Sequence, residues 1–288
     1  MGTDLAGRRA AFRRLHEAGC FVLPNPWDVG SARLLQHLGF PALATTSAGM
    51  AFSTGLPDGA VPRAAVLAHV RTIVEATDVP VSADFESGFA SDAAGVAESV
   101  RLCVETGVAG LSIEDSTGTG AAPLYDLSVA VERLRAAHAA IDASGTRVVL
   151  TARAECYLVG HPDPLRESLR RLEAYAAAGA DCLYAPGLRT PDDVAAVVKA
   201  VAPKPVNVLA SVPGFSVRQL EDLGVRRVSV GGALARAAYG ALMRAAREMA
   251  VEGTFRALGD ALPHGELNAF FREDAANRRR GPLRSSMP

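Results

Sequence analysis

The sequence predicts an α/β fold, a (β/α)8 TIM barrel with an additional C-terminal helical segment. Eight short apolar runs alternate with helical stretches at the spacing of βα units. Polar residues recur at the C-terminal ends of these runs, where barrels of this kind carry their sites. A doubly wound open sheet is the alternative, and it is disfavoured because no GxGxxG motif follows the first run.

The elements are expected in a regular order along the chain. An amphipathic helix at about 4–18 leads in, with Leu5, Phe12 and Leu15 on one side. After the first strand, Asp28 is placed to cap the next helix. The strands are expected at 21–24, 42–47, within 79–88, and at 110–115, 148–153, 182–186, 206–210 and 225–232, and the later helices at about 62–76, 92–106, 126–142, 164–178, 191–201 and 216–223.

The chain of 288 residues is expected to form a single barrel domain, since such barrels commonly run to about 250 residues as one unit. The barrel core is assigned to about 20–232 and the C-terminal helices to about 233–274. A mobile tail is expected at about 275–288, where the run of arginines at 278–280 is typical of a solvated end.

Composition excludes several classes of partner. A net charge of −1 and a pI of about 6.6 give no electrostatic basis for binding nucleic acid or an anionic membrane, which leaves a small-molecule substrate. The sequence shows no apolar signal core after Met1 and no apolar run of the roughly 18 residues that a membrane span needs. Four cysteines without CxxC pairing suit a reducing compartment, so a cytoplasmic location is expected.

Acidic side chains gather at the expected strand ends. Asp84 and Glu86 are two apart, which in a strand puts both on one face, and Glu114 ends the next strand. Asp58, in the loop after the second strand, is a fourth candidate acid. Carboxylates that repel one another without a histidine nearby suit a hard cation such as Mg²⁺, with Mn²⁺ possible. A solvated loop is the alternative reading of Asp84 and Glu86.

Candidate substrate groups lie at neighbouring strand ends. Arg153 shares a strand face with Thr151 and is interpreted as a clamp for a substrate carboxylate, with a structural ion pair to Glu114 or Glu155 as the alternative. Hydroxyls and close-approach backbone N–H groups from Thr45 onward form a turn that can hold an oxyanion. Whether Cys156 or His161 joins the site is left open. The turn residues are Thr45, Thr46, Ser47, Ala48 and Gly49.

Zinc and Schiff-base chemistry are disfavoured. The six histidines form no HxH or HxxxH pair. A Schiff-base aldolase needs a lysine in its site. Lys204 precedes the seventh strand, at the opposite face of the barrel, and Lys199 lies on a helix.

These motifs resemble the isocitrate lyase and phosphoenolpyruvate mutase superfamily. The resemblance covers the chain from about residue 23 to 232, in order and in spacing. Its specific pieces are TSAG at 46–49, GLPD at 55–58, DFE at 84–86, IED at 113–115, TAR at 151–153 and VNV at 206–208.

The resemblance implies a magnesium site in which Asp84 binds the metal directly or nearly so. Glu86 and Glu114 complete the implied metal set, acting with Asp58 largely through waters. Arg153, Glu114 and Asp58 are the implied catalytic residues. The implied substrate-binding residues are Thr45, Thr46, Ser47, Arg153 and Asn207. The resemblance also implies a homo-oligomer, either a tetramer or a dimer with an exchanged helix.

Departures from the superfamily pattern limit the prediction. The family lyases carry a cysteine motif on the loop after the fourth strand, but here the loop at 116–126 has no cysteine, lysine or histidine. Phosphonate-processing members carry an asparagine on a longer loop, and this loop has none. The stretch at 184–187 replaces the glutamate that such lyases place after strand six, and Glu86 replaces the commoner aspartate.

The prediction for function is a Mg²⁺-dependent carbon–carbon lyase that acts on an oxaloacetate-like 2-oxo or 2-hydroxy dicarboxylate through an enolate. Carbon–phosphorus chemistry, of the phosphonomutase or phosphonopyruvate hydrolase type, is one alternative. A non-catalytic barrel that binds 2-oxo acids is the other, because the loop lacks the recognised acid.

Overall fold

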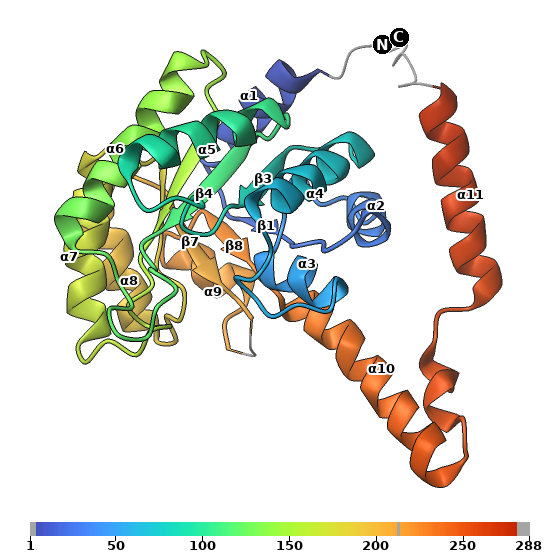
Figure 1. Ribbon diagram of the computed structural model, residues 1–288. Helices are drawn as coiled ribbons and strands as arrows, with labels where there is room; N and C mark the ends of the chain where they lie inside the picture. Colours follow the sequence, from blue (N-terminus) through green and yellow to red (C-terminus); the bar gives the residue numbers. More distant parts are fainter. Residues whose placement is uncertain (1–3, 212–213, 281–288) are drawn as a thin grey trace. The chain divides into compact units, whose positions relative to one another are not determined.

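The computed structural model describes residues 4–211 and 214–280 and divides into two compact units, residues 1–235 and 236–288. In the first unit, eight parallel strands pair in the order β1-β8-β7-β6-β5-β4-β3-β2 and form a nearly closed barrel (Figure 1). The prediction of a (β/α)8 barrel is confirmed. The strands are β1 (Phe21–Leu23), β2 (Leu43–Ala44), β3 (Val81–Asp84), β4 (Gly110–Glu114), β5 (Val149–Arg153), β6 (Cys182–Tyr184), β7 (Val206–Leu209) and β8 (Arg227–Ser229).

Hydrogen bonds, most of them made by Asn25, join the two ends of the sheet. The Ala44 amide donates to the Pro24 carbonyl at 3.0 Å, joining β2 to the residue that follows β1. Asn25 accepts from the Val230 and Gly231 amides, both at 2.9 Å, and donates to the Thr45 carbonyl at 2.9 Å. Asn25 therefore ties β1, β2 and β8 together at their C-terminal ends.

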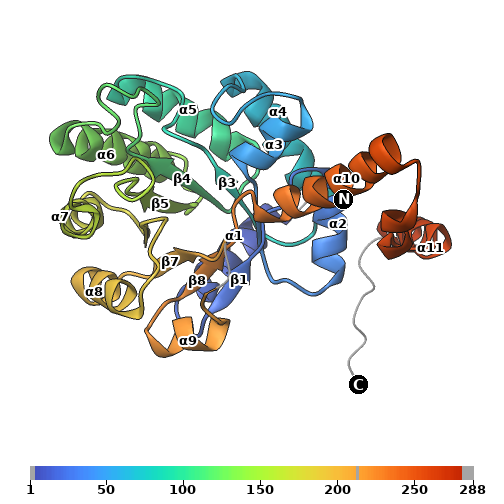
Figure 2. The ribbon, with the colours of Figure 1, turned by 90° about the horizontal axis from the view of Figure 1, so that it is seen from below.

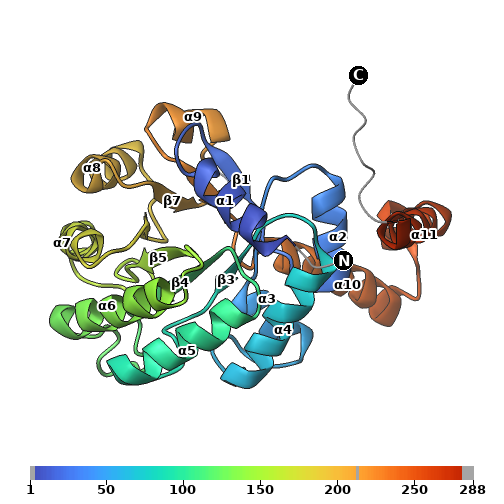
Figure 3. The ribbon, with the colours of Figure 1, turned by 90° about the horizontal axis from the view of Figure 1, so that it is seen from above.

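Helices cover the outside of the barrel and follow one another around it when it is viewed along the strands (Figures 2 and 3). Asp28 caps the helix after β1 through a capping box with Ser31, as its position predicts. These helices are α2 (Val29–His37), α3 (Ser47–Ser53), α4 (Arg63–Ala76), α5 (Ala93–Glu105), α6 (Leu127–Ala143), α7 (Pro164–Ala177), α8 (Pro191–Val201) and α9 (Val217–Asp222), while α1 (Leu5–Leu15) packs against the N-terminal end of the barrel.

Two features at the second and third strands differ from the prediction. The second strand, expected to run to residue 47, ends at Ala44, and α3 begins at Ser47 where a loop was expected. Thr46 caps α3 by accepting from the Gly49 amide at 3.2 Å. The third strand ends at Asp84, so Glu86 lies beyond it. Its φ of 48° is in the left-handed region, which ends the strand's alternation.

Apolar side chains close the N-terminal end of the barrel. Phe12 of α1 is 0% exposed and packs in one cluster with Phe21, Leu23 and other interior residues. A Cβ at Gly110 would lie 2.6 Å from the Phe12 ring, so glycine is required where that ring enters. The N-terminal end of the barrel is thus filled, which leaves the C-terminal strand ends for polar groups.

The second unit is helical. It contains most of α10 (Ala233–Glu252), a 3₁₀ helix (η1, Arg256–Asp260) and α11 (His264–Arg280). The C-terminal helices expected at about 233–274 are thus three separate elements, and the last of them continues past residue 274, into the stretch predicted as a mobile tail; residues 281–288 lie outside the described residues. The assignment of one domain to the whole chain stays a prediction. Across the described ranges, no helix is both long and apolar enough to span a membrane.

Candidate active site

Asp84 lies at the end of β3 and is held in place from the loop after β2. Its Oδ2 accepts from the Ser47 amide at 2.9 Å, and its own amide donates to Thr45 Oγ1 at 3.0 Å. The predicted oxyanion turn is therefore next to the predicted metal ligand. The Ser47 N–H, which we expected to face a substrate oxygen, is used by Asp84 in this structure.

Asp58 reaches the same place from the loop between α3 and α4. Its carboxylate hydrogen-bonds to the Ser47 side chain and is close enough to Asp84 and Arg153 to be affected by their charges. Partial desolvation raises the pKa of Asp58, Ser47 opposes this, and repulsion from Asp84 adds to the rise. The structure thus brings Asp58 close to Asp84 at the end of β3, and a catalytic role for Asp58 stays a prediction.

Arg153 stands among three carboxylates. Its Nη1 lies 3.3 Å from Asp84 Oδ1 and 3.1 Å from Glu114 Oε2, and its Nε pairs with Glu155. The β4–β5 register places Glu114 directly opposite Arg153. The structure therefore shows the ion pairs to Glu114 and Glu155 of the alternative interpretation, and the substrate clamp stays a prediction.

Negative charge exceeds positive charge at this cluster. Burial raises the pKa of Glu86 to about 7, and the charges of Asp84 and Asp58 add to the rise. The pKa of Glu114 is also raised, first by burial and then by Glu155, although Arg153 opposes the rise. Burial alone lowers the pKa of Arg153, but its carboxylate neighbours hold it well above the ordinary value. A cation bound here would relieve this repulsion.

The acids fit a hard cation that keeps much of its water. Within residues 4–211 and 214–280, no three His, Cys, Asp or Glu side chains form a group that could hold a metal ion directly. Arg153 already pairs with an oxygen of both Asp84 and Glu114. Mg²⁺ often binds through one or two carboxylates and retains several waters, and this donor set is all oxygen. The expected direct set of Asp84, Glu86 and Glu114 stays a prediction.

A cavity of about 140 Å³ opens beside Asp84 and extends into the barrel. Thr45, Thr46 and Ser47 line one side, and Arg153 and Tyr184 also line it. Several of the side chains that line the cavity are small, among them Ala44, Ser82 and Ser112, and they leave room for it. Neither Cys156 nor His161 lines it.

Asn207 also lines the cavity, but its amide already has partners. Its Oδ1 accepts from Arg227 Nε at 2.9 Å and its Nδ2 donates to Ser229 Oγ at 2.9 Å. Asn207 is completely buried. The predicted direct contact with substrate therefore stays a prediction, and the visible role of Asn207 is to link two interior side chains.

A buried network beneath Arg153 was not predicted. Asp115 accepts from the Glu155 amide at 2.8 Å, from Arg171 Nη1 at 3.0 Å and from the Tyr175 hydroxyl at 2.6 Å. It thereby fixes the backbone of Glu155, whose side chain pairs with Arg153. A signal was present, because Arg171 and Tyr175 occupy the buried face of α7 four residues apart.

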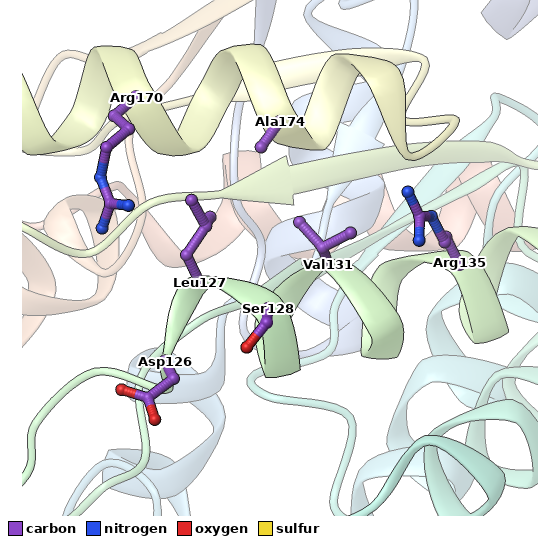
Figure 4. Close-up of a pocket in the computed structure, with 7 residues that line it drawn as sticks. All are labelled: Asp126, Leu127, Ser128, Val131, Arg135, Arg170 and Ala174. Carbon is purple, nitrogen blue, oxygen red and sulfur yellow. The ribbon is translucent and has the colours of Figure 1, made fainter.

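A second hollow lies outside the barrel, between α6 and α7 (Figure 4). Arg135 and Asp126 come from the α6 side, and Arg170 comes from α7. Arg170 is paired with Glu167 of its own helix at 2.7 Å. This hollow contains none of the predicted site residues.

Comparisons with known proteins place these features in a family. The family model for phosphoenolpyruvate phosphomutase matches residues 12–250. An uncharacterized protein of Mycobacterium tuberculosis is 34% identical over 261 residues, 90% of this chain and 95% of its own. A 2-methylisocitrate lyase of Bacillus subtilis is 26% identical, over 78% of this chain and 75% of its own. An oxaloacetate decarboxylase of Bradyrhizobium is 29% identical, over 90% and 88%.

Solved structures agree with the sequence relatives. A structure from Burkholderia cenocepacia J2315 has a TM-score of 0.90 and 50% identity, covering 93% of this chain and 97% of its own. Oxaloacetate acetylhydrolase with its product oxalate has a TM-score of 0.83 and 26% identity, covering 97% and 99%. Phosphonopyruvate hydrolase with oxalate and Mg²⁺ has a TM-score of 0.80 and 25% identity, covering 94% and 98%. The resemblance inferred from the motifs is confirmed.

Proposed function

This chain belongs to the phosphoenolpyruvate phosphomutase family, within a superfamily of lyases and mutases, and we propose that it is a Mg²⁺-dependent carbon–carbon lyase. Its substrate is an oxaloacetate-like 2-oxo or 2-hydroxy dicarboxylate, cleaved through an enolate. The observation that carries the proposal is the group of carboxylates around Asp84, which lines the cavity: burial and the charges of Asp84 and Asp58 raise the pKa of Glu86 to about 7. Relatives that act on oxaloacetate support the choice of substrate class.

The residues that would hold the cation are Asp84 directly, with Glu86, Glu114 and Asp58 through waters. A divalent cation bound there would draw electron density from a 2-oxo group and stabilise an enolate, which decarboxylation, retro-aldol cleavage and phosphonopyruvate chemistry all require. Ser47 would release its amide from Asp84 Oδ2, now 2.9 Å away, to reach the substrate.

Arg153 would bind a substrate carboxylate with its remaining nitrogen. Its Nε and Nη1 are taken by Glu155, Asp84 and Glu114, while Nη2 donates no hydrogen bond to the described residues. Because the carboxylates fix the guanidinium from one side, the free nitrogen keeps one orientation, which lowers the entropy lost when a substrate is oriented.

The loop at 116–126 gives no reason to prefer isocitrate-type substrates. Ser116 and Leu124 form an antiparallel bridge, and the Thr117 amide donates to the Pro123 carbonyl at 3.0 Å, so the loop folds back on itself. It brings no cysteine, lysine or histidine to the site. A short dicarboxylate that needs no acid from this loop is therefore favoured.

The test is a panel assay of the full chain with Mg²⁺ and with EDTA. The panel contains C4 to C6 2-oxo and 2-hydroxy dicarboxylates and phosphonopyruvate, and products are identified by NMR. We expect a 2-oxo acid product from at least one dicarboxylate, only with Mg²⁺. The matched variants are Asp84→Asn, expected to be inactive, and Asp126→Asn on the exposed start of α6, expected to match wild type.

Three other outcomes would contradict the proposal. Phosphate release from phosphonopyruvate alone would assign carbon–phosphorus chemistry. Tight binding of 2-oxo acids by calorimetry without turnover would assign a binding barrel. Turnover that EDTA does not change would show that the reaction needs no divalent cation.

A cytoplasmic location and a homo-oligomer, a tetramer or a dimer with an exchanged helix, remain part of the proposal. Sedimentation tests the assembly, and a monomer at micromolar concentration would rule out the exchange.

A further inference from the structure

The loop after β3, residues 85–92, has an unusual backbone. Of the three described non-glycine residues whose φ is in the left-handed region, two lie in this loop, Glu86 at 48° and Phe89 at 55°. Gly88, with a φ of 83°, lies between them. A residue with a side chain takes this conformation at a cost, so it persists only where other contacts hold it. The contacts that hold this loop therefore decide where the Glu86 carboxylate lies.

Contacts with the barrel fix one side of the loop. The Glu86 carbonyl accepts from the Glu114 amide at 2.9 Å, so the backbone of Glu86 lies against the end of β4. The Gly88 amide donates to the Phe85 carbonyl at 3.0 Å. Phe85 is 0% exposed, and its ring packs edge-on against Phe89 with 5.0 Å between the ring centroids. Other carbonyls of the loop are held from outside the barrel.

Arg133 of α6 holds this other side of the loop. α6 lies beside α5 in both views along the strands (Figures 2 and 3). Arg133 Nη1 donates to the Ala90 carbonyl at 2.7 Å and to the Ser91 carbonyl at 2.8 Å, and its Nη2 donates to the Ser87 carbonyl. Arg133 is 2% exposed, and its described hydrogen-bond partners are all carbonyls of this one loop. Because a buried guanidinium is costly unless its N–H groups are paired, the arginine and the loop fix each other.

Tyr125 holds the Arg133 guanidinium in place. The guanidinium carbon lies 4.1 Å from the ring centroid of Tyr125. The Tyr125 amide donates to the Asp115 carbonyl at 2.9 Å, and the Tyr125 carbonyl accepts from Arg171 Nη1 at 2.9 Å. Tyr125 is thus tied to the buried network around Asp115, and Arg133 joins that network to the loop after β3.

We infer that Arg133 is a positioning residue for the cation site, which holds the loop after β3 so that the Glu86 carboxylate stays beside Asp84. The inference rests on the proposed function, because the cation is part of that proposal. Arg133 acts through the backbone carbonyls of residues 87, 90 and 91. A lysine has a single ammonium group, which cannot bind the carbonyls on both sides of the guanidinium. Glu86 would then leave its left-handed conformation, and its water-mediated contact with the cation would be lost.

The test is a double-mutant cycle on oxalate binding with Mg²⁺, measured by calorimetry on the full chain. Arg133→Lys should weaken the Mg²⁺-dependent binding about tenfold, the usual loss when a residue that orients a metal ligand is changed. In a Glu86→Gln background, the same substitution should change the affinity by less than about twofold, because the carboxylate that Arg133 positions is already absent. A general loss of stability would act equally in both backgrounds.

The matched control is Arg9→Lys. Arg9 also binds backbone carbonyls, that of Val108 through Nε at 2.9 Å and that of Val104 through Nη2 at 3.1 Å. It lies on α1, which packs against the N-terminal end of the barrel, away from the predicted cation site. The oxalate affinity of Arg9→Lys should therefore stay within about twofold of wild type.

Amide hydrogen exchange of the metal-free protein gives a readout that does not depend on the cation. Arg133→Lys should speed exchange in a peptide that covers residues 85–92 by about tenfold or more, and Arg9→Lys should leave that peptide unchanged. If Arg133→Lys does not fold, Tyr125→Leu replaces it in the same cycle, because it removes the ring against the guanidinium and leaves the hydrogen-bonding groups of Arg133 in place.

Oxalate affinity of Arg133→Lys within about twofold of wild type would overturn the inference. An equal loss of affinity in the wild-type and Glu86→Gln backgrounds, or unchanged exchange at 85–92, would also overturn it. When wild type still binds oxalate with Mg²⁺, these results leave the proposed function intact. A wild-type protein that binds no oxalate with Mg²⁺ would overturn the proposed function, and the role of Arg133 with it.

Discussion

Asp115→Asn should destabilise the protein strongly although it removes no atom from the core. Asp115 is 3% exposed, with the Glu155 amide on Oδ1 and both Arg171 and Tyr175 on Oδ2. An asparagine keeps one oxygen and replaces the other by an NH2 group. In either orientation, the NH2 group faces a donor, and at least one buried donor loses its acceptor.

The magnitude follows from these contacts. An unsatisfied buried donor costs about 1–3 kcal/mol, and breaking a buried ion pair costs about 3–5 kcal/mol. Arg171 keeps its second partner, Glu167, at 2.7 Å, which reduces the loss. We therefore expect the free energy of unfolding to fall by about 2–4 kcal/mol and the melting temperature by about 10 °C.

Urea unfolding followed by circular dichroism, with thermal scans beside it, measures this loss. Asp126→Asn is the matched control, because Asp126 is exposed and its side chain makes no capping hydrogen bond, so a change within about 0.5 kcal/mol is expected. An Asp115→Asn protein within 1 kcal/mol of wild type would refute the reasoning that this network supports Glu155 and Arg153.

Two further predictions concern the site. Glu86 has a pKa raised from 4.5 to about 7, so without metal its contribution to stability is present below pH 4.5 and is lost as pH rises through 7. Mg²⁺ affinity, measured by calorimetry, should rise from pH 6 to 8, and Glu86→Gln should lose most of that rise; an equal rise in both proteins would contradict the assignment. Arg153→Lys keeps the charge but cannot span Asp84, Glu114 and Glu155, so kcat/KM for the identified substrate should fall roughly hundredfold, about 2.7 kcal/mol. A fall in kcat/KM of less than threefold would show that a positive charge at this position is sufficient without the guanidinium group.

The strand ends were predictable because their signal is local. Strands β4 and β5 are apolar runs that each end in a charged residue, and the register pairs those residues, Glu114 and Arg153, across neighbouring strands. Parallel strands in a barrel bring such ends together whatever the helices between them do. The same rule predicted that Asp84, at the end of β3, lies at the site.

Other parts depend on backbone geometry or long-range packing that a sequence pattern does not contain. The seven-residue helix α3 is too short for a clear periodicity, and the left-handed φ of Glu86 is unusual for a residue with a side chain. Asp115 contacts Arg171 and Tyr175, which lie 56 and 60 residues further along the chain, so no local pattern links the three residues. The prediction therefore assigned the site role to the neighbouring Glu114. Arg227, a charged residue on the inner face of β8, was a readable signal that the strand-end rule did not use.

The most direct test of the central claim is calorimetry of oxalate binding to Asp84→Asn and to wild type, each with and without Mg²⁺. The claim is that Asp84 holds the cation that a 2-oxo acid chelates at the mouth of this cavity. Wild type should bind oxalate tightly only with Mg²⁺, and Asp84→Asn should lose that Mg²⁺-dependent part while its unfolding midpoint stays near wild type. Mg²⁺-dependent oxalate binding that survives in Asp84→Asn would contradict the claim.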